Sequence, residues 1–133
     1  MCDTCCVYPV SMTKKILVID DDPDVLELFE YTLKKEGYKV VTAPSGLNAA
    51  WALEEDSPPD VILLDLMMPT LDGYELCRYL KSSDEFKDIP VVIVSAKGSP
   101  EDVRKGLEMG ADKYLPKSSF SMQTLLSEVK AVL

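Results

Sequence analysis

The 133-residue sequence contains no histidine. Histidine is the usual general base near neutral pH and the commonest protein ligand of transition metals. Its absence excludes catalysis by serine–histidine–aspartate or cysteine–histidine groups, and it excludes metal sites built on imidazole. A function that depends on these side chains is therefore removed from consideration.

Long apolar runs and basic residues are also scarce. No apolar segment approaches the roughly 18–20 residues that a membrane-spanning helix needs, so we expect no membrane association. Lysine and arginine number 14 against 23 acidic residues, which gives a net charge of −9. An acidic surface repels phosphate backbones, so we expect no nucleic-acid binding. The length and the hydrophobic content of 47% fit one soluble globular domain.

Three of the four cysteines, Cys2, Cys5 and Cys6, lie in the short stretch CDTCC, and Cys77 lies far away. A closed zinc site needs four ligands, and neither a second cysteine pair nor histidine supplies them. The segment also lacks the basic start and apolar stretch of a signal peptide. We predict a disordered N-terminal extension over residues 1–13 with free thiols, a domain over residues 14–133, and a reducing cytoplasmic location.

Strand-like and helix-like segments alternate along the rest of the chain. Continuous apolar runs predict strands at Ile16–Asp20, Tyr38–Ala43, Val61–Asp65, Val91–Ser95 and within residues 111–117. Helical spacing or capping residues predict helices at Pro23–Glu36, Leu47–Glu55, Asp72–Lys81, between Ser99 and Gly110, and at Ser121–Leu133. Strict alternation of buried strands with helices predicts an α/β fold, a doubly wound five-stranded parallel sheet with helices on both faces.

Apolar spacing also predicts which side of each helix faces the sheet. In the first helix, Leu26, Phe29 and Leu33 recur at helical intervals. In the second helix we expect Leu47, Ala50 and Leu53 to face inward.

Polar side chains follow most of the predicted strands. They are Asp20, Asp21 and Asp22 after the first strand, Asp65 after the third, Ser95 at the end of the fourth, and Lys117 after the fifth. Ligands of such sheets bind beyond the carboxyl ends of the strands. Each residue alone has an ordinary structural explanation, such as a helix cap for Asp22 or a solvated surface lysine for Lys117. Their joint placement favours a functional site.

Carboxylates that converge within a few ångströms must either take up protons or bind a cation. Since neither histidine nor cysteine lies nearby, the available ligands are hard oxygens, which favour Mg²⁺ over zinc. Such a pocket, joined by the lysine and the hydroxyl, suits a phosphoryl group. One carboxylate could then attack phosphorus and form an aspartyl phosphate.

Four stretches of the sequence resemble a known family. They are ILVIDDD, PDVILLDLMMPTLDG, VVIVSA and GADKYLPK, and they are similar to the receiver domain of two-component response regulators, including the chemotaxis type. The resemblance covers nearly all of the chain beyond the first dozen residues. It implies a flavodoxin-like three-layer α/β/α architecture with strand order 2-1-3-4-5, an order that is described for this kind of fold.

The resemblance also implies roles for individual residues. Asp65 would accept the phosphoryl group. Asp21 would be the main Mg²⁺ ligand, Asp20 would assist partly through water, Asp65 would also bind the metal, and Met67 would contribute its backbone carbonyl.

Ser95 and Lys117 would bind the phosphoryl oxygens. Ser95 and Tyr114 would form the switch: Ser95 would move toward the new charge, and Tyr114 would turn inward into the vacated space. The face formed by the fourth helix, fifth strand and fifth helix would then change its partner preference.

The function implied is that of a phosphorylation-dependent signalling switch. A sensor histidine kinase or a phosphotransfer protein would donate the phosphoryl group from phosphohistidine, and slow autodephosphorylation would end the signal. The label of enzyme is therefore a matter of convention. A downstream protein or output domain would read the state, and a homodimer through the same face is a further partner that the resemblance allows.

Three alternatives stay open. A phosphohydrolase with an aspartate nucleophile usually has a second acid two residues later, where this chain has Met67. A flavin-binding module would place a phosphate beside Asp20, Asp21 and Asp22, which would repel it. A degenerate receiver would act only as an interaction surface.

One departure concerns the residue after Lys117. Many receivers have proline there, joined by a cis peptide bond, whereas this chain has Ser118. A cis bond before a residue other than proline costs about 3–4 kcal/mol, so we expect trans.

Overall fold

Residues 14–54, 58–68, 71–119 and 121–133 are described by the structure, a computed structural model. The predictions for residues 1–13, including Cys2, Cys5 and Cys6, lie outside the described residues. Among the described residues, no helix is both long and apolar enough to cross a membrane.

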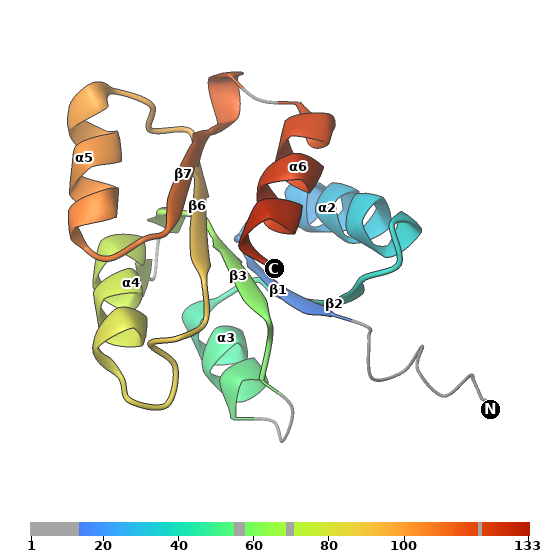
Figure 1. Cartoon of the computed structure of the whole chain (residues 1–133), viewed down its shortest axis with the longest axis horizontal. Helices are drawn as coiled ribbons and strands as arrows, with labels where there is room; N and C mark the ends of the chain where they lie inside the picture. The colour runs from blue at the N-terminus through green and yellow to red at the C-terminus, as the bar shows by residue number, and fades with distance from the viewer. Residues whose placement is uncertain (1–13, 55–57, 69–70, 120) are drawn as a thin grey trace.

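Five buried apolar segments form a parallel sheet (Figure 1). Its strands are β1 (Lys15–Ile19), β2 (Lys39–Ala43), β3 (Val61–Leu64), β6 (Val91–Ser95) and β7 (Lys113–Pro116). Neighbouring strands follow the order β2-β1-β3-β6-β7, which reads 2-1-3-4-5 when these strands are counted alone. The predicted fold and strand order are thereby confirmed.

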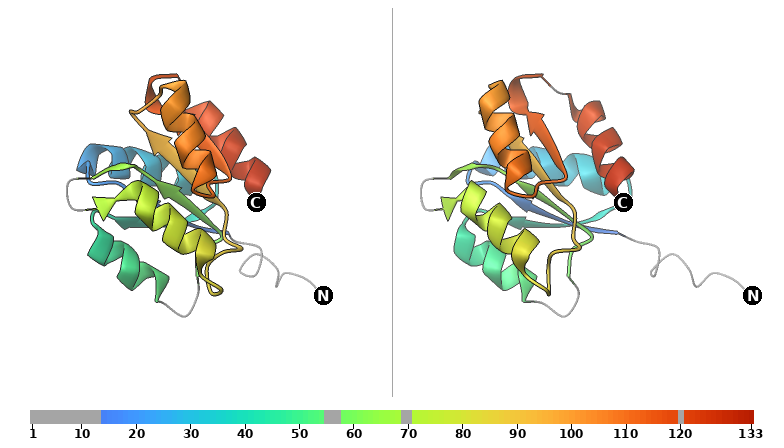
Figure 2. Two further views of the ribbon diagram at one scale, coloured as in Figure 1. Left: turned by 90° about the vertical axis from the view of Figure 1, so that its left-hand side faces the viewer. Right: turned by 60° about the vertical axis from the view of Figure 1, so that its left-hand side comes forward.

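Helices cover both faces of the sheet, as Figures 1 and 2 show. One face carries α2 (Pro23–Lys35) and α6 (Met122–Val132), and the other carries α3 (Gly46–Leu53), α4 (Gly73–Ser82) and α5 (Pro100–Glu108). Side chains start the helices where the sequence predicts caps. Asp22 accepts a hydrogen bond from the amide of Asp24, and Ser99 accepts one from the amide of Asp102.

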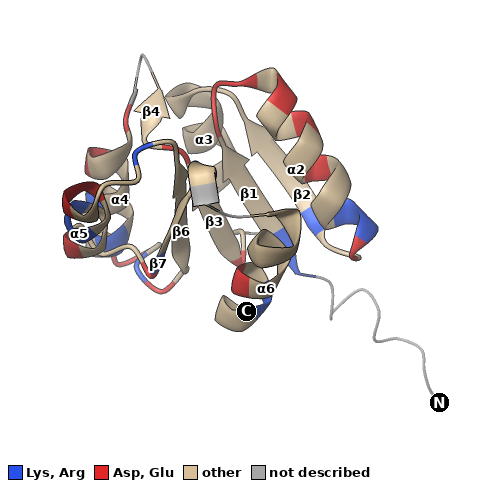
Figure 3. Ribbon diagram, turned by 90° about the horizontal axis from the view of Figure 1, so that it is seen from above, with Lys and Arg blue, Asp and Glu red and all other residues tan. Residues whose placement is uncertain are grey.

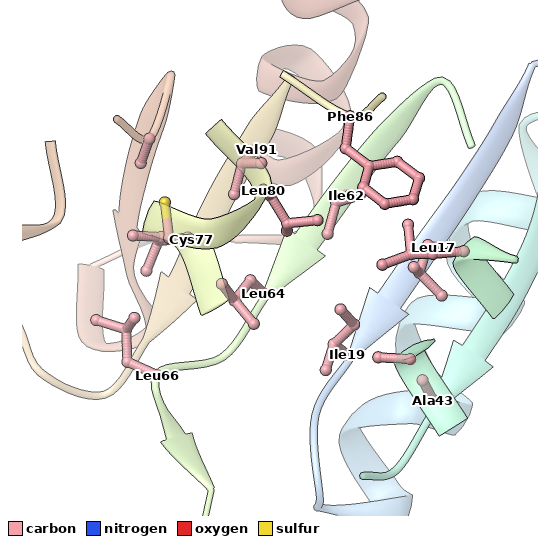
Figure 4. Close-up of a cluster of buried hydrophobic side chains, with 14 of the residues drawn as sticks. Leu17, Ile19, Ala43, Ile62, Leu64, Leu66, Cys77, Leu80, Phe86 and Val91 are labelled. Atoms are coloured by element: carbon pink, nitrogen blue, oxygen red, sulfur yellow. The ribbon is translucent and has the colours of Figure 1, made fainter. Parts of the chain in front are cut away.

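Two apolar cores hold these layers together. The core under α2 and α6 includes Leu33, Leu125 and Val129. The core under α3 and α4 includes Leu64 and Leu80, and Figure 4 shows their side chains meeting between the sheet and the helices. Because alternate residues of each strand enter opposite cores, both faces of β1, β3 and β6 are buried.

Three short elements were not predicted. Met67–Met68 (β4) and Leu71–Asp72 (β5) form an antiparallel pair after β3, and Lys117–Ser119 form one turn of 3₁₀ helix. Gly73 lets α4 start close to the segment after β3, since a Cβ there would lie 2.6 Å from the Cα of Leu66.

The predicted inner face of α3 is partly wrong. Leu53 is buried as expected, but Leu47 is 60% exposed and Ala50 is also exposed. Ala49 and Ala52 face the core instead. Nearly every residue of this helix is apolar, so spacing alone did not distinguish its faces. The small alanine side chains allow the closer approach to the sheet.

Candidate functional site

The strand ends bring the predicted polar residues to one edge of the sheet. Asp20 follows β1, Asp65 follows β3, Ser95 ends β6 and Lys117 follows β7. These four strands are consecutive neighbours in the sheet. The alignment of β1 with β3 pairs the last residue of each strand, so Asp20 and Asp65 emerge side by side.

Three carboxylates converge at this edge. Asp20, Asp21 and Asp65 each offer an oxygen, and these oxygens all lie within 4.8 Å of one another. Asp20 and Asp65 are 3% and 5% exposed, whereas Asp21 faces solvent. Figure 3 shows acidic residues in red along the segment that leads from β1 into α2. The edge therefore combines two buried acids with an accessible third one.

Lys117 is the cation of this cluster. Its Nζ lies 2.9 Å from Oδ2 of Asp20 and 3.9 Å from Oδ2 of Asp65. A single ammonium group cannot neutralise three carboxylates, so the cluster has a surplus of negative charge. Such a surplus in a buried place is costly unless protons or a cation offset it. The peptide bond between Lys117 and Ser118 is trans, as expected.

The surplus affects Asp65 most clearly. Burial raises the pKa of Asp65 above its ordinary value, and the neighbouring charge of Asp20 raises it further. The amide of Met67, which donates to Oδ1 of Asp65 at 3.2 Å, and the ammonium of Lys117 act in the opposite direction. The net result is a carboxylate that gains from any added positive charge.

The donor set fits a hard divalent cation. Mg²⁺ is usually bound through one or two carboxylates, with water or phosphate oxygens completing its shell. The exposed carboxylate of Asp21 leaves the cluster open to solvent on one side. One oxygen of Asp20 has a partner already, since Oδ1 accepts from the amide of Asp22 at 2.9 Å. Met67 lies beside Asp65 in β4, but its carbonyl as a ligand stays a prediction.

Ser95 ends the strand next to β3, and Tyr114 lies on the neighbouring strand β7. Ser95 is fully buried, and its Oγ accepts a hydrogen bond from the amide of Lys97 at 3.1 Å. The hydroxyl of Tyr114 donates to the carbonyl of Lys97 at 2.6 Å. Burial raises the pKa of Tyr114 to about 12, against a smaller lowering effect of the Ser95 hydroxyl. The two predicted switch residues thus contact the same loop after β6.

Tyr74 is a neighbouring residue that the sequence did not single out. Its side chain is buried, and the ammonium groups of Lys105 and Lys97 lie 4.3 and 5.6 Å from the centre of its ring. Its hydroxyl has no hydrogen-bond partner among the described residues. Its spacing from Cys77 and Leu80 in α4 marks an inward position, but the lysines come from other segments.

Comparison with known proteins gives a consistent result. A family model described as the response regulator receiver domain matches residues 16–130. The signal receiver domain of a signal transduction histidine kinase from Syntrophus aciditrophicus has 35% identity and a TM-score of 0.81, with 91% of this chain and 90% of that chain covered. The chemotaxis protein CheY4 of Vibrio cholerae has 32% identity and a TM-score of 0.81, with 91% and 99% covered.

A third similar structure is titled as the BeF3-activated receiver domain of DrrB, a protein of Thermotoga maritima. It has 33% identity and a TM-score of 0.79, with 91% of this chain and 97% of that chain covered.

Proposed function

The chain belongs to the family of response regulator receiver domains, and on that premise we propose that it is a switch driven by phosphorylation of Asp65. The donor is a phosphohistidine of a sensor histidine kinase or of a phosphotransfer protein. The observation that carries this proposal is the surplus of buried negative charge around Asp65. A bound cation would offset this charge, and the carboxylate of Asp65 would be the nucleophile for an incoming phosphoryl group.

In the transfer step, a carboxylate oxygen of Asp65 attacks phosphorus while the bond from phosphorus to the imidazole nitrogen breaks. The imidazole leaves and takes up a proton from solvent. Lys117 lies within 3.9 Å of Asp65, so its ammonium can hold a phosphoryl oxygen on the new aspartyl phosphate. Ser95 donates its hydroxyl to a second oxygen.

Asp20, Asp21 and Asp65, with the carbonyl of Met67, would hold the Mg²⁺. When bound, Mg²⁺ supplies the positive charge that offsets the phosphoryl oxygens. Water then hydrolyses the aspartyl phosphate slowly and restores Asp65. This return requires no separate turnover substrate.

The signal is read through Ser95 and Tyr114. A phosphoryl group on Asp65 draws the Ser95 hydroxyl toward it and changes the space that the ring of Tyr114 occupies. Tyr114 already binds the loop after β6 through Lys97, so a shift of this loop alters the surface made by α5, β7 and α6. This surface would select a downstream protein, an output domain or a second copy of the chain.

Two observations support the proposal from outside the site. Beryllium fluoride has the shape and charge of a phosphoryl group, and the similar DrrB receiver domain is described as activated by it. A cytoplasmic location fits the buried thiol of Cys77, which is free of any disulfide.

The test is a phosphorylation assay read by intact mass. The purified protein is incubated with Mg²⁺ and acetyl phosphate, and we expect the mass of one added phosphoryl group. Asp65→Asn should gain none, and chelation of Mg²⁺ should prevent the addition in the wild type. Absence of an adduct in the wild type would favour a degenerate receiver, and an adduct on Asp65→Asn would contradict the assignment of the acceptor.

A further inference from the structure

A groove lies between α3 and α4, and Glu85 and Phe86 of the segment after α4 complete its lining. Figure 2 shows the two helices side by side in both views. The groove has a volume of about 170 Å³ and is partly open to solvent. Its apolar lining consists of Ala50, Leu53, Leu76, Tyr79 and Phe86. The space is large enough for one or two apolar side chains of a partner.

The helices that form the groove expose large apolar side chains. The helix α3 contains no charged residue between Gly46 and Leu53. Leu47 and Trp51 are 60% and 58% exposed, and Tyr79 on α4 is 57% exposed. Tyr79 lines the groove, and Leu47 and Trp51 each follow a lining residue of α3 in the sequence. Exposed apolar side chains next to a groove mark an interaction surface, and tryptophan and tyrosine contribute most to such contacts.

The charge at one end of the groove is negative. Glu54 and Glu85 line it, and neither has a cationic partner among the described residues. Both α3 and α4 end here, so the negative ends of two helix dipoles add to the two carboxylates. The basic side chain in the last turn of α4, Lys81, is already bound to Asp112.

Other basic side chains near the groove are also engaged. Nη2 of Arg78 lies 2.7 Å from Oε2 of Glu75, and Nζ of Lys87 lies 3.3 Å from Oδ1 of Asp84. The lining therefore presents an apolar channel with unmatched acids at one end.

We infer that this groove binds a cationic amphipathic helical segment of another protein. The apolar side chains of the segment fill the channel between α3 and α4, and its lysine or arginine side chains lie against Glu54 and Glu85. The net charge of −9 disfavours two other occupants, a second copy of the chain and an anionic membrane surface. A second copy would bring like charges together, and an anionic membrane surface would repel the acids.

The site lies apart from Asp65. The acidic end of the groove is at the amino ends of the strands, where α3 leads toward β3 and α4 leads toward β6, whereas Asp65 follows the carboxyl end of β3. The binding can therefore be measured on the unmodified protein.

The test uses Trp51, the single tryptophan of the chain, as a reporter. The probe is a synthetic peptide of leucine and lysine arranged as an amphipathic helix. We expect saturable binding with a blue shift of the Trp51 emission, because the peptide covers the indole. The control peptide carries glutamate in place of every lysine and should cause no shift. Equal binding of both peptides would overturn the proposal.

Two double variants separate the groove from general charge attraction. Glu54→Lys with Glu85→Lys should weaken binding of the cationic peptide by about tenfold, from two exposed charge pairs. Glu27→Lys with Glu36→Lys changes the net charge equally at two exposed positions, one on α2 and one at its C-terminal cap, and it should leave the affinity unchanged. Equal weakening in both doubles would show non-specific attraction and contradict the proposal.

Ala50→Arg gives an independent test, since its side chain would occupy the channel. We expect it to abolish binding while circular dichroism shows an unchanged fold. Sedimentation of the wild type without peptide measures its oligomeric state and so tests whether a second copy occupies the groove. A dimer that Ala50→Arg dissociates would assign the groove to a second copy and overturn the assignment to a cationic segment.

Discussion

Two charged networks lie at opposite ends of β6, and they differ in their balance. At the amino end, Oδ2 of Asp112 accepts hydrogen bonds from the amide of Val91 at 2.8 Å and from Lys81 at 3.0 Å. Lys81 also donates to the carbonyl of Ile89 at 3.1 Å. At the carboxyl end, Lys117 faces Asp20, Asp21 and Asp65 together.

The difference indicates a structural role for the first network and a ligand-binding role for the second. The pair of Lys81 and Asp112 matches one cation with one anion and satisfies both with backbone groups, so it ties α4 to the start of β6. The cluster around Asp65 leaves carboxylates unmatched, at a cost in stability. We expect a ligand to offset this excess, and the balanced pair serves as an internal control in the predictions on phosphorylation, unfolding and Mg²⁺ below.

The largest expected effect comes from removing Lys117, with the removal of Lys81 as the control. Lys117→Met should lower the rate of phosphorylation by acetyl phosphate by about 10²–10³-fold, because it removes one preorganised donor to the phosphoryl oxygens. Lys81→Met should change this rate very little. The rates are measured by intact mass at fixed Mg²⁺, and equal losses in the two variants would contradict the distinction.

Neutralising one acid in each network should change stability in opposite directions. Without Mg²⁺ at neutral pH, Asp65→Asn should raise the free energy of unfolding by about 1 kcal/mol, because it relieves repulsion from Asp20. Asp112→Asn should lower it by about 1 kcal/mol, because Lys81 loses a partly exposed ionic partner. Urea denaturation followed by circular dichroism measures both, and a change of the same sign would refute the comparison.

Magnesium should stabilise only through the unbalanced network. At about ten times its Kd, Mg²⁺ should add about 1.4 kcal/mol to the free energy of unfolding of the wild type. The double variant Asp20→Asn with Asp21→Asn should lose this gain, whereas Asp112→Asn should keep it. A gain that survives in the double variant would place the cation elsewhere.

The change of the free energy of unfolding with pH should depend on Asp65. Its pKa in the folded protein is raised above the ordinary value of 3.8, so the folded state holds this proton more tightly than the unfolded state does. In Mg²⁺-free buffer, the stability of the wild type relative to Asp65→Asn should therefore rise as the pH falls from above the raised pKa toward 3.8. Urea midpoints over this range measure the difference, and a relative stability that falls instead would reverse the sign of the shift.

Much of this arrangement could be predicted from the sequence, because strands buried on both faces leave continuous apolar runs. The run that ends at Ile19 predicts both β1 and the position of Asp20. The run Val61–Leu64 does the same for Asp65. Strand ends fix where side chains emerge, so residues distant in the chain can be assigned to one edge before their contacts are known.

Other features depend on contacts that no local pattern records. In α3, apolar residues lie on more than one side, so spacing could not show that Leu47 stays exposed while Ala49 is buried. The pairing of β4 with β5 involves strands too short to show alternation. Tyr74 gains its surroundings from Lys97 and Lys105, which belong to other segments.

The central claim is that a divalent cation balances the excess charge around Asp65. Anomalous diffraction from crystals soaked in Mn²⁺, which binds the same hard oxygens as Mg²⁺ and scatters anomalously, tests it most directly. The account predicts one strong peak within bonding distance of carboxylate oxygens of Asp21 and Asp65, and none beside Lys81 and Asp112. A map without a peak at the carboxylates, or with its main peak elsewhere, would contradict it.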